Sequence, residues 1–105
     1  MTETRFPVGK TSDFAEDSIT AVELGGQELV IIRQGDEFFA LPDQCTHERY
    51  PLHDGELLDG KVKCIKHGAT FDLRTGRATM PAIRKIRIFD TLVEGDELFV
   101  LMQEA

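Results

Sequence analysis

The most informative stretch of the sequence is residues 45–72, CTHERYPLHDGELLDGKVKCIKHGATFD. They hold two pairs of candidate metal ligands, Cys45 with His47 and Cys64 with His67, and sixteen residues separate the pairs. Each pair combines a thiol with an imidazole. Such a set of four can close a tetrahedral zinc site, or it can hold an iron–sulfur cluster with two thiolates on one iron and two imidazoles on the other.

The spacing within the pairs favours the cluster. One residue separates the ligands of the first pair and two residues separate those of the second, and both pairs mix their ligand types. Zinc modules more often place like ligands together, as in Cys-x-x-Cys. In a cluster, Cys45 and Cys64 would meet on an inner iron, whereas His47 and His67 would meet on an outer iron nearer solvent. Electrons would then enter and leave through the histidine end.

Outside the ligand stretch, the pattern predicts an all-β domain. Short runs rich in Val, Ile, Phe and Leu alternate with turn residues, and no long run has the 3.6-residue period of a helix. The 105 residues leave room for one domain. We expect a loop over residues 42–60. Strands are expected at residues 19–24, 28–33, 37–41, 61–64 and 70–73, followed by a terminal hairpin that ends near residue 101.

The charge of the chain argues against several classes of partner. Twelve Lys and Arg stand against nineteen Asp and Glu, which gives a formal net charge of −7 and disfavours nucleic acids and anionic membranes. The distribution is uneven, because residues 45–87 hold nine basic and five acidic residues. No stretch is apolar enough to span a membrane, and residues 1–7 lack a secretory signal. We therefore expect a cytoplasmic protein without a disulfide.

The ligand stretch and its flanks resemble the Rieske family, and more closely the small Rieske ferredoxins of bacterial aromatic-ring-hydroxylating dioxygenase systems. The resemblance covers about residues 28–102. It implies one [2Fe–2S] cluster on Cys45, His47, Cys64 and His67. It also implies a single Rieske domain at residues 1–105, an all-β sandwich of antiparallel sheets in which about residues 43–82 form a small cluster-binding subdomain. Besides the four ligands, the resemblance rests on Leu52, Gly55, Leu57, Gly60, Gly68–Asp72 and Thr75-Gly76.

The function implied by this resemblance is electron transfer. The chain would carry single electrons from a flavin-dependent ferredoxin reductase to a terminal Rieske oxygenase, as a monomer and without catalysis of its own. A complete oxygenase also needs a mononuclear iron held by two histidines and a carboxylate, and only His53 remains after the ligands are assigned. Two alternatives stay open: a small Rieske subunit of another oxidoreductase, such as a nitrite reductase, and a structural zinc module for protein interaction.

Two residues near the second ligand pair bear on the reduction potential. Relatives of high potential carry serine two residues after the second histidine and tyrosine four residues after it, where this chain has Ala69 and Phe71. Neither side chain can donate a hydrogen bond to a cluster sulfur. We therefore predict a potential near the bottom of the Rieske range of about −150 to +300 mV. We also expect Gly68 to let the backbone approach the cluster, and His53 to be a surface residue. Met80-Pro81 is expected in a loop that shields the cluster.

Overall fold

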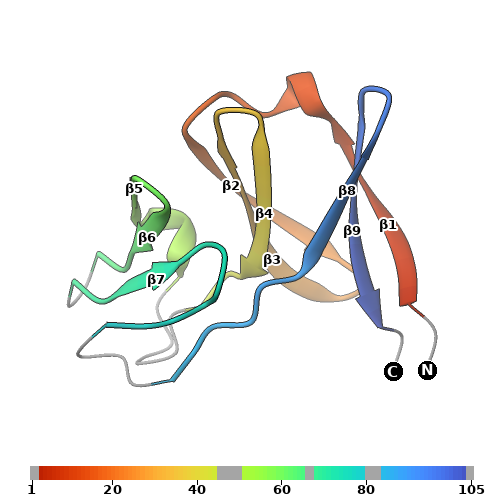
Figure 1. The fold of residues 1–105 in the computed structure, drawn as a ribbon. Coiled ribbons are helices and arrows are strands. Elements are labelled where there is room, and N and C mark those ends of the chain that lie inside the picture. Colours follow the sequence, from red (N-terminus) through yellow and green to blue (C-terminus); the bar gives the residue numbers. More distant parts are fainter. Residues whose placement is uncertain (1–2, 45–50, 66–67, 80–83, 104–105) are drawn as a thin grey trace.

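The structure is a computed structural model that describes residues 3–44, 51–65, 68–79 and 84–103. In these residues the chain forms nine strands arranged in three antiparallel sheets of three strands each, with two single-turn 3-10 helices (Figure 1). The elements are β1 (Glu3–Lys10), η1 (Thr11–Asp13), β2 (Ser18–Leu24), β3 (Gln27–Gln34), β4 (Glu37–Pro42), η2 (Leu52–Asp54), β5 (Glu56–Leu58), β6 (Lys61–Lys63), β7 (Thr70–Asp72), β8 (Asp90–Glu94) and β9 (Glu97–Gln103).

The sheet β2-β3-β4 is a meander of two hairpins, as the sequence predicts. Its central strand, β3, is buried on both faces, which explains the uninterrupted apolar run from Leu29 to Ile32. Successive side chains of a strand point to opposite faces, so this run supplies two separate cores. Val30 and Ile32 belong to a cluster shared with β6 and β7, while Leu29 and Ile31 pack with residues of β9. Strand β3 therefore joins the two halves of the molecule.

The second sheet, in the order β1-β9-β8, pairs the first strand of the chain with the last. Glu3 lies opposite Gln103, and the pairing continues to Lys10 opposite Glu97, with a bulge between Pro7 and Gly9. The two ends of the chain therefore lie side by side at one edge of the molecule (Figure 1). Strand β1 is additional to the strands expected from the sequence, the first of which begins at residue 19. In the residues that the structure describes, no helix is long and apolar enough to cross a membrane.

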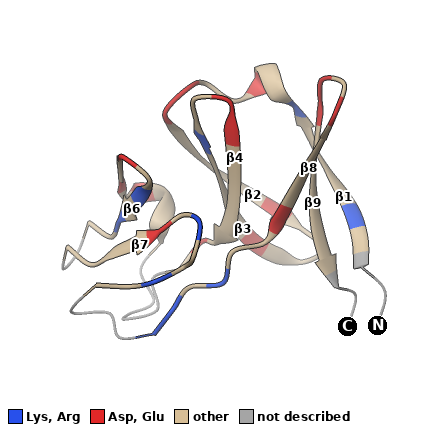
Figure 2. Cartoon of the chain, in the orientation of Figure 1, with Lys and Arg blue, Asp and Glu red and all other residues tan. Residues whose placement is uncertain are grey.

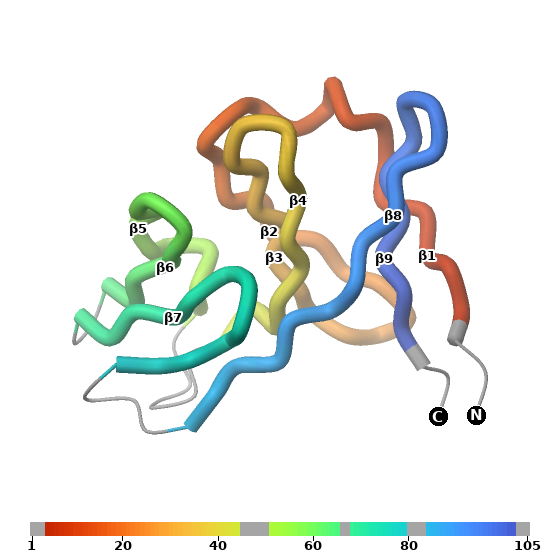
Figure 3. Tube along the Cα trace, in the orientation of Figure 1, coloured from red at the N-terminus to blue at the C-terminus, as the bar shows by residue number. Residues whose placement is uncertain are grey.

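In the third and smallest sheet, β5-β6-β7, Cys64 follows directly after β6. The chain enters this part after β4 and returns from it through a long connection to β8 (Figure 3). An isolated bridge between Phe71 and Ala78 adds part of that connection to the edge of the sheet at β7. Strand β5 lies within the stretch expected to be a loop, so that expectation is wrong for residues 56–58. The predicted all-β sandwich with a small additional sheet is confirmed.

Candidate iron–sulfur site

The second ligand pair begins where β6 ends. The Cys64 backbone N–H donates to the Ala69 carbonyl at 2.7 Å, and the Gly68 N–H donates to the Cys64 carbonyl at 3.1 Å. These two hydrogen bonds hold Cys64 against Gly68 and Ala69 between β6 and β7. Gly68 has a φ of +78°, a conformation that side chains with a Cβ rarely adopt. The Gly68 N–H is bonded to the Cys64 carbonyl, and its positive φ is that of a turn glycine.

Cys64 is embedded in an apolar environment. Its exposed fraction is 2%, and it belongs to a core with Leu52, Val62, Ala69 and Phe71, all of which are fully buried. The next residue, Ile65, is by contrast 60% exposed, so the chain turns out to solvent directly after the thiol. An apolar shell controls the access of water to a metal site and so influences its potential. This environment suits a thiolate ligand on the inner side of a cluster.

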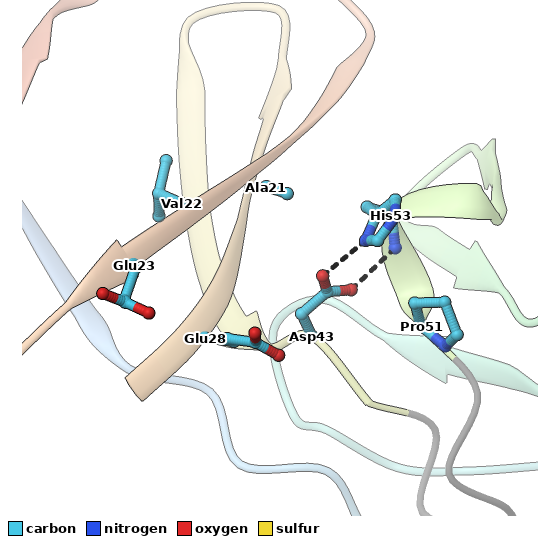
Figure 4. A pocket seen from close by; sticks show the side chains of 7 residues that line it. All are labelled: Ala21, Val22, Glu23, Glu28, Asp43, Pro51 and His53. Carbon is cyan, nitrogen blue, oxygen red and sulfur yellow. Dashed lines mark hydrogen bonds and ion pairs between the residues drawn. The ribbon is translucent and has the colours of Figure 1, made fainter. Parts of the chain in front are cut away.

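The first ligand pair is bracketed by a contact that the sequence analysis did not predict. Asp43, just before the loop, accepts two bonds from His53, just after it: one from the His53 backbone N–H to Oδ1 at 2.8 Å, and one between Oδ2 and His53 Nδ1 at 2.5 Å (Figure 4). The Asp43 side chain is only 6% exposed and that of His53 is 41% exposed. This pair, which we call the loop clamp, fixes the two ends of the segment that contains Cys45 and His47.

The loop clamp also changes the acidity of its histidine. The hydrogen bond with Asp43 raises the pKa of His53 above its ordinary value, and the carboxylates of Asp43, Asp54 and Glu28 act in the same direction. Both clamp residues line a pocket of about 280 Å³ next to β2 (Figure 4). His53 is a surface residue, as expected, but it also has a specific structural partner. A spacing of ten residues between Asp43 and His53 follows no periodic pattern, so the sequence offered no signal for this contact.

A close backbone contact connects the regions around the two ligand pairs. A Cβ atom built on Gly55, at the end of η2, would lie 2.4 Å from the Lys63 carbonyl oxygen and 2.9 Å from that of Leu52. No real side chain tolerates such distances. Gly55 therefore lets the segment that follows the first loop lie directly against the residue that precedes Cys64.

The structure describes one of the four predicted ligands. Cys64 is placed as above, whereas Cys45, His47 and His67 lie outside the described residues, as does Met80-Pro81. What is described fits a [2Fe–2S] cluster: a buried sulfur donor follows strand β6, and a contact between Asp43 and His53 joins the two ends of the segment that contains the first ligand pair.

Comparison with known proteins agrees with this geometry. The model of the family described as "Rieske [2Fe-2S] domain" matches residues 4–90. The chain belongs to the Rieske [2Fe–2S] domain family. A Rieske domain binds one [2Fe–2S] cluster, so the predicted cofactor is confirmed and the zinc alternative is set aside.

Relatives of this Rieske domain include several ferredoxins. It is 36% identical over 91 residues to the ferredoxin component of biphenyl 2,3-dioxygenase from Rhodococcus jostii, covering 86% of this chain and 85% of that protein. It is 41% identical over 93 residues to the ferredoxin component of the p-cumate 2,3-dioxygenase system from Pseudomonas putida, covering 86% and 79%. Among solved structures, the ferredoxin of carbazole 1,9a-dioxygenase from Nocardioides aromaticivorans superposes with a TM-score of 0.84 at 29% identity, covering 90% of this chain and 95% of that one.

Proposed function

We propose that this Rieske protein carries single electrons from a flavin-dependent reductase to the terminal oxygenase of an aromatic-ring-hydroxylating dioxygenase system. The observation that carries the proposal is the match, over most of both chains, to proteins named as ferredoxin components of such systems. A solved complex of reduced oxygenase and oxidised ferredoxin in carbazole 1,9a-dioxygenase, 30% identical to this chain, supports an oxygenase as the electron acceptor. We further propose that the protein acts in the cytoplasm as a monomer and catalyses no reaction alone.

The four proposed ligands are Cys45, His47, Cys64 and His67, within a cluster-binding subdomain at about residues 43–82. When bound, the cluster accepts and releases one electron. Two thiolates from Cys45 and Cys64 neutralise the charge of two ferric ions and two sulfides, and neutral imidazoles add none. Reduction then produces a net charge of only −1, whereas four thiolates would begin at −2. The mixed ligand set therefore makes the cluster easier to reduce.

A matched set of histidine variants tests the ligand assignment. His47→Ala and His67→Ala should each abolish the visible spectrum and the electron paramagnetic resonance signal of the reduced Rieske cluster, because each leaves the outer iron with a missing ligand. His53→Ala removes the third histidine, which the structure places in the loop clamp, and should retain both signals. A native spectrum in His47→Ala or in His67→Ala would contradict the assignment.

Reconstitution tests the function. The purified protein should support product formation by an aromatic-ring-hydroxylating oxygenase and its reductase, and omitting it should stop the reaction. A small subunit of another oxidoreductase would instead purify in a tight complex with a larger chain. Isolation of such a complex, with no activity in the dioxygenase system, would refute the proposal.

A further inference from the structure

A group of exposed basic residues lies on the connection from β7 to β8. Between residues 73 and 89 the chain has five basic residues and no acidic one, although the whole protein has a net charge of −7. One of the five, Arg74, is paired with Glu37 at 2.5 Å. The other four, which we call the basic strip, are exposed: Arg77, Arg84, Lys85 and Arg87.

The fold brings the two parts of the basic strip together. The Ile86 N–H donates to the Gly76 carbonyl at 2.9 Å, so the segment around Arg77 and the segment 84–87 lie side by side. A Cβ on Gly76 would lie 2.1 Å from the Ile86 carbonyl oxygen, which shows how closely the two backbones approach. Four basic side chains that are up to ten residues apart in sequence are thereby gathered along one connection.

The basic strip is adjacent to the sheet that carries Cys64. The Asp72 N–H donates to the Arg77 carbonyl at 2.9 Å, and the Thr79 N–H donates to the Thr70 carbonyl at 2.9 Å. The segment 77–79 is therefore bonded along β7, and β7 is the strand that follows the turn of the second ligand pair. Thr79 lies beside Thr70, next to the ligand turn, whereas Arg77 lies beside Asp72, at the other end of β7, so the basic strip borders the outer edge of the cluster-binding sheet.

Most of the strip's charge is not compensated within the described part of the chain. Arg77, Lys85 and Arg87 form no ion pair with any described carboxylate, in contrast to Arg5, which pairs with Glu94. The Arg87 guanidinium lies over the Phe89 ring at 4.6 Å, which orients the group and leaves its positive charge in place. Among the residues that the structure describes, these three side chains therefore present positive charge to a partner molecule.

Acidic residues are concentrated elsewhere. Figure 2 shows basic residues along the connection between β7 and β8, acidic residues at the turns at the top of the view, and further acidic residues where β7 ends and β8 begins. Three acidic residues lie at the turn between β8 and β9, namely Glu94, Asp96 and Glu97. Such a separation of charge orients a protein as it approaches a charged partner and raises the association rate.

We propose that the basic strip is the docking surface for an acidic face of the protein with which this chain exchanges electrons. The inference rests on the proposed function, because electron exchange requires a partner to approach the cluster-binding sheet closely and briefly. A nucleic acid fits less well, since the net charge of −7 repels a long polyanion and four positive side chains cannot offset that repulsion. A protein with a local acidic patch meets the strip without contacting the acidic turn between β8 and β9.

Charge reversals in the holoprotein test the proposal. Lys85→Glu and Arg77→Glu should each lower the second-order rate constant of electron transfer with the reductase or the oxygenase of the source organism about threefold to tenfold at low ionic strength. Lys10→Glu is the matched control: it makes the same change in net charge on β1, where Lys10 lies near Asp96, and should change the rate less than about twofold. At about 1 M salt the differences should vanish, because charges are screened beyond about 3 Å.

The possible outcomes separate this inference from the proposed function. Every variant should retain the wild-type visible spectrum and potential, which shows that the cluster is intact. If the wild type transfers electrons and Lys85→Glu is as fast as Lys10→Glu at low salt, the basic strip is not the docking surface, although the proposed function stands. If the wild type transfers electrons to neither partner, both fail. Binding of a short duplex DNA that Lys85→Glu abolishes would assign the strip to nucleic acid and overturn the proposal.

Discussion

Replacing Gly76 with alanine should destabilise the protein far more than the same replacement at Gly95. Both glycines have positive φ, +77° and +61° respectively, so alanine costs about 1 kcal/mol at either position for the backbone conformation. At Gly95 nothing lies within 4 Å of the added Cβ. At Gly76 the Cβ would lie 2.1 Å from the Ile86 carbonyl oxygen, so the two segments must separate by about an ångström to reach an ordinary contact.

That separation removes the hydrogen bond from the Ile86 N–H to the Gly76 carbonyl, worth about 1 kcal/mol, and loosens Ile86, which is 3% exposed. We expect Gly76→Ala to cost about 3 kcal/mol and Gly95→Ala about 1 kcal/mol. The difference corresponds to roughly 8–16 °C in melting temperature for a domain of this size, measured on the holoprotein by circular dichroism. Equal losses in the two variants would refute the claim that the contact with Ile86, rather than the positive φ, makes glycine necessary at position 76.

Three further predictions concern the cluster-binding half. The wild-type reduction potential should lie below about −50 mV in direct electrochemistry. Ala69→Ser should raise this potential by tens of millivolts up to about 100 mV, because a hydrogen bond to a charged acceptor is worth about 1.5–3 kcal/mol. A wild-type potential above about +100 mV would contradict the prediction. Because the pKa of His53 is raised in the folded protein, the loop clamp stabilises the fold fully below the unfolded pKa of about 6.5 and loses part of this effect as the pH rises through the folded pKa. In urea unfolding, His53→Ala should therefore lose more stability relative to wild type at pH 6 than at pH 9. An equal loss at both pH values would argue against a charged clamp. Leu52→Ala should cost about 2–5 kcal/mol and speed cluster loss on dilution into urea, because Leu52 is fully buried in the core that contains Cys64; a variant as stable as wild type would contradict the shared core.

The fold was predictable where neighbouring strands are joined by short turns. The hairpins of β2, β3 and β4 follow from short apolar runs separated by glycine-containing turns, and the terminal hairpin follows in the same way. Strand β1 was not predictable, because Pro7 and the bulge at Gly9 interrupt its alternation and its partner β9 lies at the other end of the chain. Strand β5 has three residues, too few to show a period among the turn residues that surround it.

The site was predictable in its chemistry and less so in its supporting contacts. The position of Cys64 at a strand end follows from the alternation of Lys61–Lys63 and the turn residues after it. The loop clamp depends on where the chain places Asp43 relative to η2, which no local pattern encodes. The basic strip was visible only as an excess of positive charge in the middle of the chain, because its assembly depends on the close contact of Gly76 with Ile86.

The pairing of Glu3 with Gln103 has a consequence for how this domain can be used in larger proteins. Entry and exit lie next to each other in the sheet β1-β9-β8, which packs against β3 on the side away from Cys64. The domain can therefore be inserted into a longer polypeptide without opening its strands or covering the cluster-binding sheet. The terminal oxygenase of carbazole 1,9a-dioxygenase from Nocardioides aromaticivorans, of which this fold covers 30% at 26% identity, shows the same architecture serving as one module of a larger chain. Because its ends are adjacent, the same fold can serve as a separate carrier or as one domain of a larger protein.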